Sequence, residues 1–207
     1  MFQLLPMKAI MTNDEKILEA QLRECYGRVV YTHKTHEKCA DILLSRDASI
    51  KWGQIILSAI LAGGIMTMFF DFECLQKYKK IAELLSAIIS TILLVLNSYV
   101  KDYKLNVIAH EHRQAAAKIW LIREKYLSLL TDLKMQFMPI QELSKQRDKL
   151  LEELHSIYIV APSTNFKAYE KAQNALKQME EMTFSDEEID KFLPKELRRG
   201  VENETKD

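Results

Sequence analysis

The sequence contains little glycine and little proline, and this scarcity argues against a turn-rich β protein. There are five glycines and four prolines among 207 residues, and residues 158–160 form the only short β-prone run. Cysteine is scarce too. Cys25, Cys39 and Cys74 form no C-x-x-C pair, and an odd number of cysteines suits a reducing compartment. We therefore expect an all-α protein whose flanks lie in a reducing environment.

Net charge and catalytic motifs are also absent. Lys plus Arg and Asp plus Glu each number 29, so the formal charge is zero and gives no reason to expect direct nucleic-acid binding. There is no G-x-S-x-G motif, P-loop or dinucleotide fingerprint. His33, His36 and Cys39 have helical spacing, but no further ligands converge on them, so we expect a structural role and no metal site. The sequence predicts no enzyme, no cofactor and no metal.

Charge is missing from two long runs, and these organise the chain. Residues 52–70 carry no charged side chain, and neither do residues 84–100, which residues 81–82 extend past Glu83. At 1.5 Å of rise per residue, the first run spans roughly 28 Å, close to the hydrocarbon thickness of a bilayer. Two helices buried in a soluble core are the alternative, but core helices are seldom apolar on every face. We interpret residues 51–100 as a transmembrane hairpin with spans at about 52–70 and 81–100.

The flanks, residues 1–50 and 101–207, are helical by pattern. Thr12 and Glu15 form a capping box that predicts a helix to about residue 46. A second helix is expected to run directly out of the second span to about residue 137, before Pro139. Two further helices are expected, one with Phe166, Tyr169, Ala172, Leu176 and Met179 on one face and one from the Ser185–Glu188 capping box to about residue 192.

Each flank also carries a coiled-coil seam, with apolar residues spaced alternately by three and four. The seam before the hairpin comprises Leu18, Leu22, Cys25, Val29, Thr32, His36, Cys39 and Leu43. The seam after it comprises Leu105, Ile108, His112, Ala115, Ile119, Ile122, Tyr126, Leu129 and Leu133. We expect these seams to pack together, within or between subunits. The fold class is thus an all-α membrane protein whose hairpin continues into long cytoplasmic helices that form an oligomeric helical bundle.

An even number of spans places both termini on one side of the membrane. The Lys and Arg bias is weak, but most of the chain lies in the flanks, and the first residues do not form a signal peptide. We therefore expect an inner-membrane, multi-pass protein with cytoplasmic termini.

Polar residues inside the spans are candidate functional residues. Glu83, Ser86, Ser90 and Asn97 share one face of the second span, and two uses remain open: a pore lining or a helix–helix contact. In the first span, Ser58, Ala59, Ala62 and Gly63 form a small-residue face, for which we expect close helix packing.

The layout resembles the SLATT family, two-transmembrane effector domains associated with SMODS nucleotidyltransferases and SLOG nucleotide sensors. The resemblance covers about residues 12–199 and includes the run HEHRQAAAKIWLIREKYLSLLTDL and the closing segment FSDEEIDKFLPKELR. It implies an effector of a prokaryotic antiphage conflict system, with no catalytic residues to carry over. Such an effector would homo-oligomerise and permeabilise or disrupt the inner membrane when a partner is activated, such as a nucleotidyltransferase, a nucleotide sensor or a reverse transcriptase. The alternative is a non-catalytic membrane scaffold or a subunit of a larger membrane complex.

Overall fold

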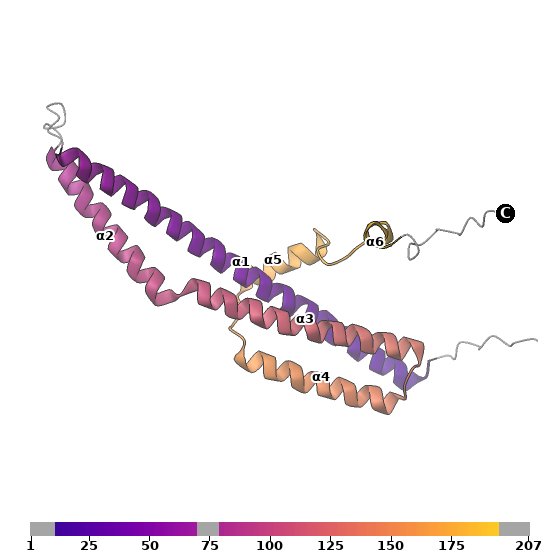
Figure 1. The fold of residues 1–207 in the computed structure, drawn as a ribbon. Coiled ribbons are helices and arrows are strands. Elements are labelled where there is room, and N and C mark those ends of the chain that lie inside the picture. The colour runs from indigo at the N-terminus through magenta and orange to yellow at the C-terminus, as the bar shows by residue number, and fades with distance from the viewer. Residues whose placement is uncertain (1–10, 70–78, 195–207) are drawn as a thin grey trace, which may run out of the picture.

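The computed structural model describes residues 11–69 and 79–194, and the described residues form helices and no strand. The expected all-α class is confirmed for this part of the chain. Cys74 and residue 70, the end of the first predicted span, lie outside the described residues. The helices, shown in Figure 1, are α1 (Asn13–Phe69), α2 (Lys79–Tyr103), α3 (Leu105–Met135), α4 (Ile140–Val160), α5 (Phe166–Lys177) and α6 (Asp186–Phe192).

Helix α1 joins the first flank and the first apolar run in one uninterrupted element of 57 residues. It begins at the predicted capping box: the Thr12 backbone N–H donates to the Glu15 carboxylate at 2.7 Å, and the Glu15 N–H donates to the Thr12 hydroxyl at 3.3 Å. At 1.5 Å per residue, α1 is about 86 Å long. A single continuous helix therefore connects the hairpin to the rest of the described chain.

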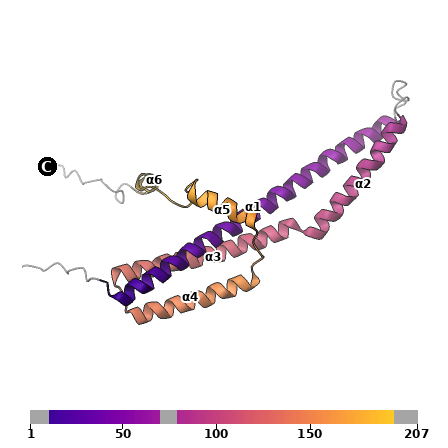
Figure 2. The ribbon, with the colours of Figure 1, turned by 180° about the vertical axis from the view of Figure 1, so that it is seen from behind.

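The second run does not continue directly into the following helix, so that prediction was wrong. Lys104 adopts a left-handed conformation, with φ 43° and ψ 45°, and separates α2 from α3. Its N–H donates to the Val100 carbonyl at 3.3 Å, and its carbonyl accepts from the Val107 N–H at 2.9 Å. The chain changes direction between α2 and α3, as Figures 1 and 2 show. Lysine has no special preference for this conformation, so nothing in the sequence marks the break.

Helix α3 ends close to the predicted position. Gln136 is left-handed, its N–H donates to the Leu133 carbonyl at 3.2 Å, and the Phe137 N–H donates to the Asp132 carbonyl at 3.0 Å. This is a Schellman arrangement, which satisfies carbonyls left free at a helix end. Pro139 then starts α4 from an extended conformation. The short turn folds α4 back along α3.

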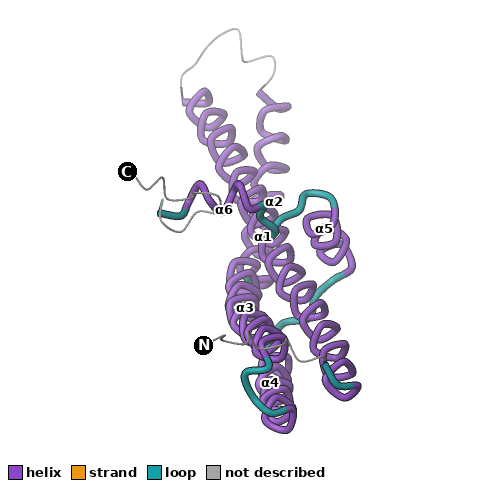
Figure 3. The backbone as a smooth tube through the Cα atoms, turned by 90° about the vertical axis from the view of Figure 1, so that its right-hand side faces the viewer, coloured by secondary structure: helices purple, strands orange, loops and turns teal. Residues whose placement is uncertain are grey.

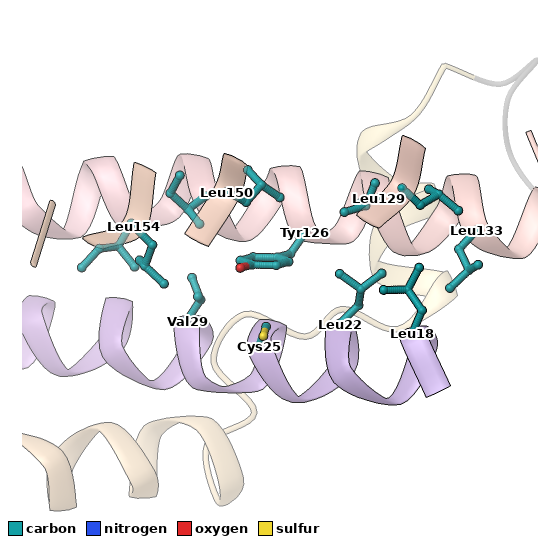
Figure 4. Packing of buried hydrophobic residues seen from close by; sticks show 12 residues of the cluster. Leu18, Leu22, Cys25, Val29, Tyr126, Leu129, Leu133, Leu150 and Leu154 are labelled. Carbon is teal, nitrogen blue, oxygen red and sulfur yellow. The ribbon is translucent and has the colours of Figure 1, made fainter. Parts of the chain in front are cut away.

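A hydrophobic core forms where α1, α3 and α4 meet (Figure 4). Tyr126 lies at its centre and is 1% exposed, and burial raises the pKa of its hydroxyl to about 12. Of the two sequence seams, Thr32, Leu43 and Ile108 are half-buried and the other members are buried. The α4 side chains in the core are Leu143, Leu150 and Leu154.

Helix α5 packs on the side of α1 away from α3 (Figure 3). The face predicted for it is right at Ala172, which is buried, and at Leu176, which is half-buried. It is wrong at Phe166 and Tyr169, which are exposed, and Met179 lies beyond the end of the helix. The other buried positions are Ala168 and Ala175. Short side chains allow the backbones of α5 and α1 to approach closely, and this contact outweighs the burial of larger side chains. The predicted α6 is confirmed, including its Ser185 capping box.

Candidate functional site: the apolar hairpin and the polar contacts beside it

Large apolar side chains are exposed along the end of α1 and along α2, and no residue of α2 is buried. Both helices are long and apolar enough to cross a membrane, and the most apolar window of each has none of its residues buried. Trp52 and Met66 on α1 are 65% and 61% exposed, and Leu84 and Leu94 on α2 are 63% and 67% exposed. A core helix of a soluble protein would bury these side chains. Their exposure indicates a hydrocarbon environment.

The two hairpin helices are joined by a polar contact. The Gln54 side-chain amide on α1 donates to the Asn97 side-chain oxygen on α2 at 2.9 Å. Nearer the loop that joins the two helices, a Cβ added at Gly64 would lie 3.8 Å from the Ser86 hydroxyl oxygen, an ordinary van der Waals distance. Two members of the predicted polar stripe, Asn97 and Ser86, therefore contact α1 within one chain.

The remaining stripe residues point elsewhere. The Ser90 hydroxyl donates to the Ser86 carbonyl of its own helix at 2.8 Å, which satisfies the hydroxyl without a neighbouring helix. Glu83, Ser90 and Asn97 are exposed, whereas Ser86 is half-buried. A single chain thus divides the stripe between the α1 contact and the outer surface, and encloses no lumen with it.

The small-residue face of α1 is exposed as well. Ser58, Ala59, Ala62 and Gly63 are all exposed. The half-buried positions of the same stretch are instead Gly53, Gln54, Leu57, Leu61 and Gly64. The face that α1 buries within the chain is therefore not the predicted one, and the small-residue face stays open.

Two seam histidines meet at the α1–α3 interface. The Nδ1 atoms of His36 and His112 lie 2.9 Å apart, and both side chains are buried. Burial, followed by the charges of His112 and His33, lowers the pKa of His36 to about 4; burial also lowers the pKa of His112. At neutral pH one neutral ring donates and the other accepts. Periodicity placed each histidine in a seam, but it carried no information on which residues meet across helices.

A charged groove lies between α1 and α3 beside this pair, and sequence analysis did not single it out. Lys34 is 8% exposed and contacts Glu37 at 2.8 Å and Glu181 at 2.6 Å. Burial lowers the pKa of Lys34, but its hydrogen bonds to Glu181 and Glu37 outweigh this effect, so the pKa is raised. Across the described residues, no group of three or more His, Cys, Asp or Glu side chains is arranged to hold a metal ion.

Comparison with known proteins identifies the family. A family model, "SMODS and SLOG-associating 2TM effector domain family 4", matches residues 18–188. No curated protein and no solved structure matched the chain. The matched region includes α2, α3, α4 and α5, and its two-transmembrane description agrees with the two exposed apolar helices. The chain therefore belongs to the SLATT family of two-transmembrane effector domains, as a member of its family 4.

Proposed function

We propose that the protein is a membrane effector of a prokaryotic antiphage conflict system, which homo-oligomerises and permeabilises the inner membrane when a partner is activated. The observation that carries this proposal is the hairpin, whose apolar windows have none of their residues buried. Family membership supports a membrane effector in conflict systems. In this proposal residues 51–100 cross the inner membrane, and residues 1–50 and 101–207 lie in the cytoplasm.

A pore requires several copies of the chain, because two helices leave no lumen between them. The exposed residues Glu83, Ser90 and Asn97 supply polar groups that could line a shared channel, Asn97 after release from Gln54. The open small-residue face supplies a surface on which another helix can approach closely. We propose that these two faces meet neighbouring copies in the active oligomer, and that the exposed surface of the cytoplasmic helices helps gather them.

The trigger in this proposal comes from a partner protein. The described residues contain no recognised sensor or catalytic motif, and the cytoplasmic helices offer the surfaces for an interaction. We propose a partner encoded nearby, of the nucleotidyltransferase, nucleotide-sensor or reverse-transcriptase class. One observation favours the second candidate, a non-catalytic membrane scaffold: Asn97 is hydrogen-bonded to Gln54, which is the use of a polar residue for helix packing.

Substitutions in the hairpin separate these two functions. The test is the leakage of dye and ions after phage challenge, in cells that carry both this protein and its partner. If Asn97 lines a pore, Asn97→Leu and Glu83→Leu reduce leakage, whereas Gln54→Leu does not. If Asn97 only joins the helices, Gln54→Leu reproduces the effect of Asn97→Leu and the double variant is no worse than either.

Ser98→Leu is the matched control, since Ser98 is exposed on α2 beside Asn97 but outside the stripe. All variants must insert into membranes at the wild-type level. Protection of wild-type cells without any change in membrane potential or permeability would refute the pore and favour the scaffold.

A further inference from the structure

We infer that the groove between α1 and α3 is a binding site for a small organic anion, whose acidic group takes the place of the Glu181 carboxylate between Lys34 and Lys38. The groove has a volume of about 820 Å³, within the range of roughly 300–1,000 Å³ found for small-molecule sites. It lies in the part of the chain outside the hairpin, so this binding does not depend on the proposed function.

The floor of the groove is built from buried polar side chains of α1. Lys34 and His33 are 8% and 6% exposed. Among the residues that the structure describes, His33 Nδ1 is the one buried side-chain nitrogen or oxygen without a hydrogen-bond partner. A buried polar atom without a partner is costly, so the chain itself does not fully satisfy the polar groups behind the groove wall.

Glu181 already occupies the position of an acidic ligand. Its carboxylate accepts from Lys34 at 2.6 Å and from Lys38 at 3.2 Å. These contacts, that with Lys34 first, lower the pKa of Glu181 and keep it charged. The contact is long-range: Glu181 lies in the segment of residues 178–185 that joins α5 to α6. Its carboxylate shows which chemistry the two lysines accept.

The segment that carries Glu181 is strained. Glu180 and Met182, on either side, have positive φ values of 49° and 77°. Residues other than glycine adopt this region at a cost, so the surrounding contacts must hold the segment in place. An external anion that replaces the Glu181 carboxylate at the lysines lets this strain relax, which offsets part of the lost ion pair.

The remaining walls explain why the ligand is organic and not a simple inorganic ion. Trp120 from α3 and Phe184 from the joining segment are 46% and 67% exposed and line the groove. Aromatic side chains of this kind provide flat surfaces for a planar group. The groove is also far larger than one carboxylate. An acidic group at Lys34 and Lys38, with a ring against Trp120, uses both features.

The charge balance favours an anion once Glu181 has left. The groove is then lined by four cationic side chains, Lys34, Lys38, Arg113 and Arg123, and by two carboxylates, Glu37 and Asp41. Asp41 is engaged by Arg113 at 3.4 Å, and Glu37 by Lys34 at 2.8 Å. Arg123 is engaged by Glu124 at 2.6 Å, so Lys38 is the cation that loses its carboxylate when Glu181 leaves.

Fluorescence of Trp120 tests binding directly in the full chain in detergent. The sequence contains two tryptophans, so Trp52→Phe leaves Trp120 as the only tryptophan, which is excited selectively at wavelengths that tyrosine does not absorb. We titrate this protein with phenyl phosphate, benzoate and inorganic phosphate. We expect a saturable change with phenyl phosphate or benzoate, and the stronger of the two identifies a phosphoryl or carboxylate ligand. Glu181→Gln should tighten this binding about fivefold, because the competing ion pair is removed. Lys38→Gln should weaken it by a similar factor.

Glu153→Gln is the matched control. It breaks another Lys–Glu contact between elements, Lys125 to Glu153 at 2.5 Å, outside the groove, and should leave the affinity unchanged. Equal affinities of the Glu181→Gln and Glu153→Gln proteins would overturn the proposal, as would the absence of saturation in the Glu181→Gln protein. Binding of inorganic phosphate as tight as that of phenyl phosphate would overturn an organic ligand. None of these readouts involves the membrane, so failure here is distinct from failure of the pore.

Discussion

Mild acid is expected to destabilise the packing of α1 on α3, because His36 and His112 are buried there in their neutral forms. In the unfolded chain, His36 titrates near its ordinary pKa of 6.5; in the folded chain, burial and then the neighbouring histidines lower this pKa to about 4. Between these values the unfolded chain binds more protons than the folded chain. Stability is therefore fully present above pH 6.5 and is lost as the pH falls toward 4.

The size of the effect follows from the same numbers. For His36 alone, the loss at pH 5 is about 2 kcal/mol. In a chain of this length, that lowers Tm by about 4–8 °C. Burial lowers the pKa of His112 and His33 as well, and these groups act in the same direction. Glu37 and Glu111 oppose the shifts at His33 and His112, but burial is the larger effect at both.

The assay is thermal unfolding of the detergent-solubilised protein, followed by circular dichroism at pH 7.5 and at pH 5. Contacts with Lys34 and Lys134 lower the pKa of Glu181 and Glu19 respectively, so these carboxylates contribute below about pH 4.5 and stay outside the chosen window. Replacing both members of the pair, His36→Leu with His112→Leu, should remove most of the pH dependence, since neither ring is then left unpaired. His110→Leu is the control, because His110 is exposed on the same helix.

Two results would refute this reasoning. The first is a Tm that does not change between pH 7.5 and pH 5. The second is a double variant that keeps the whole pH dependence of the wild type, which would place its origin in other groups.

The other predictions concern the core, the helix break and the membrane. Ile119→Asp places an unpaired carboxylate at a site that is 0% exposed and should lower the free energy of unfolding by about 3–5 kcal/mol. Leu121→Asp, at a site 50% exposed, should lower it little. Equal Tm values for these two proteins would contradict the core assignment. Lys104→Gly should raise stability by about 1 kcal/mol because glycine adopts the left-handed conformation without the steric cost that lysine has. Lys101→Gly, inside α2, should lower stability by a similar amount. A lower Tm for the Lys104→Gly protein would argue against the helix break. Alkaline carbonate should leave the protein in the membrane fraction, and release would argue against the hairpin. In intact cells, a membrane-impermeant thiol reagent should label Cys74 and should not label a cysteine introduced at the exposed Ser128. The reverse pattern would mean that the topology is inverted. Cys25 and Cys39 are buried and so cannot be used to determine the topology.

Local sequence signals predicted the helices because their causes lie within a few residues. The Thr12 and Ser185 capping boxes need residues three positions apart, and both are present in the structure. The two long uncharged runs could also be recognised without knowledge of neighbouring residues. The two spans predicted from these runs agree with the two-transmembrane description of the matched family. Such features can be derived from a single sequence.

Features that depend on contacts between distant residues could not be derived in the same way. Nothing around Lys104 distinguishes it from a helix interior, and Gln136 lacks the glycine that normally marks a left-handed cap. On α5, Phe166 and Tyr169 were expected to share the packed face with Ala172, but tertiary packing buries Ala172 together with Ala168 and Ala175 and leaves the two aromatic residues exposed. The contacts of Gln54 with Asn97, and of Lys34 with Glu181, join residues far apart in the chain. Periodicity assigns residues to faces but not to partners.

The uninterrupted course of α1 makes the two halves of the hairpin mechanically unequal. From Asn13 to Phe69, α1 is one uninterrupted helix, so a rotation of its N-terminal end about the helix axis is passed along to its apolar end. Helices α2 and α3 are instead separated by the left-handed Lys104. A rotation of α3 is therefore not passed directly to α2. Rotation of α1 therefore acts on the apolar helices directly. Helix α2 responds through its side-chain contacts with α1, such as the hydrogen bond between Gln54 and Asn97. A force on the helices outside the hairpin would thus reach the two apolar helices as a rotation of one against the other.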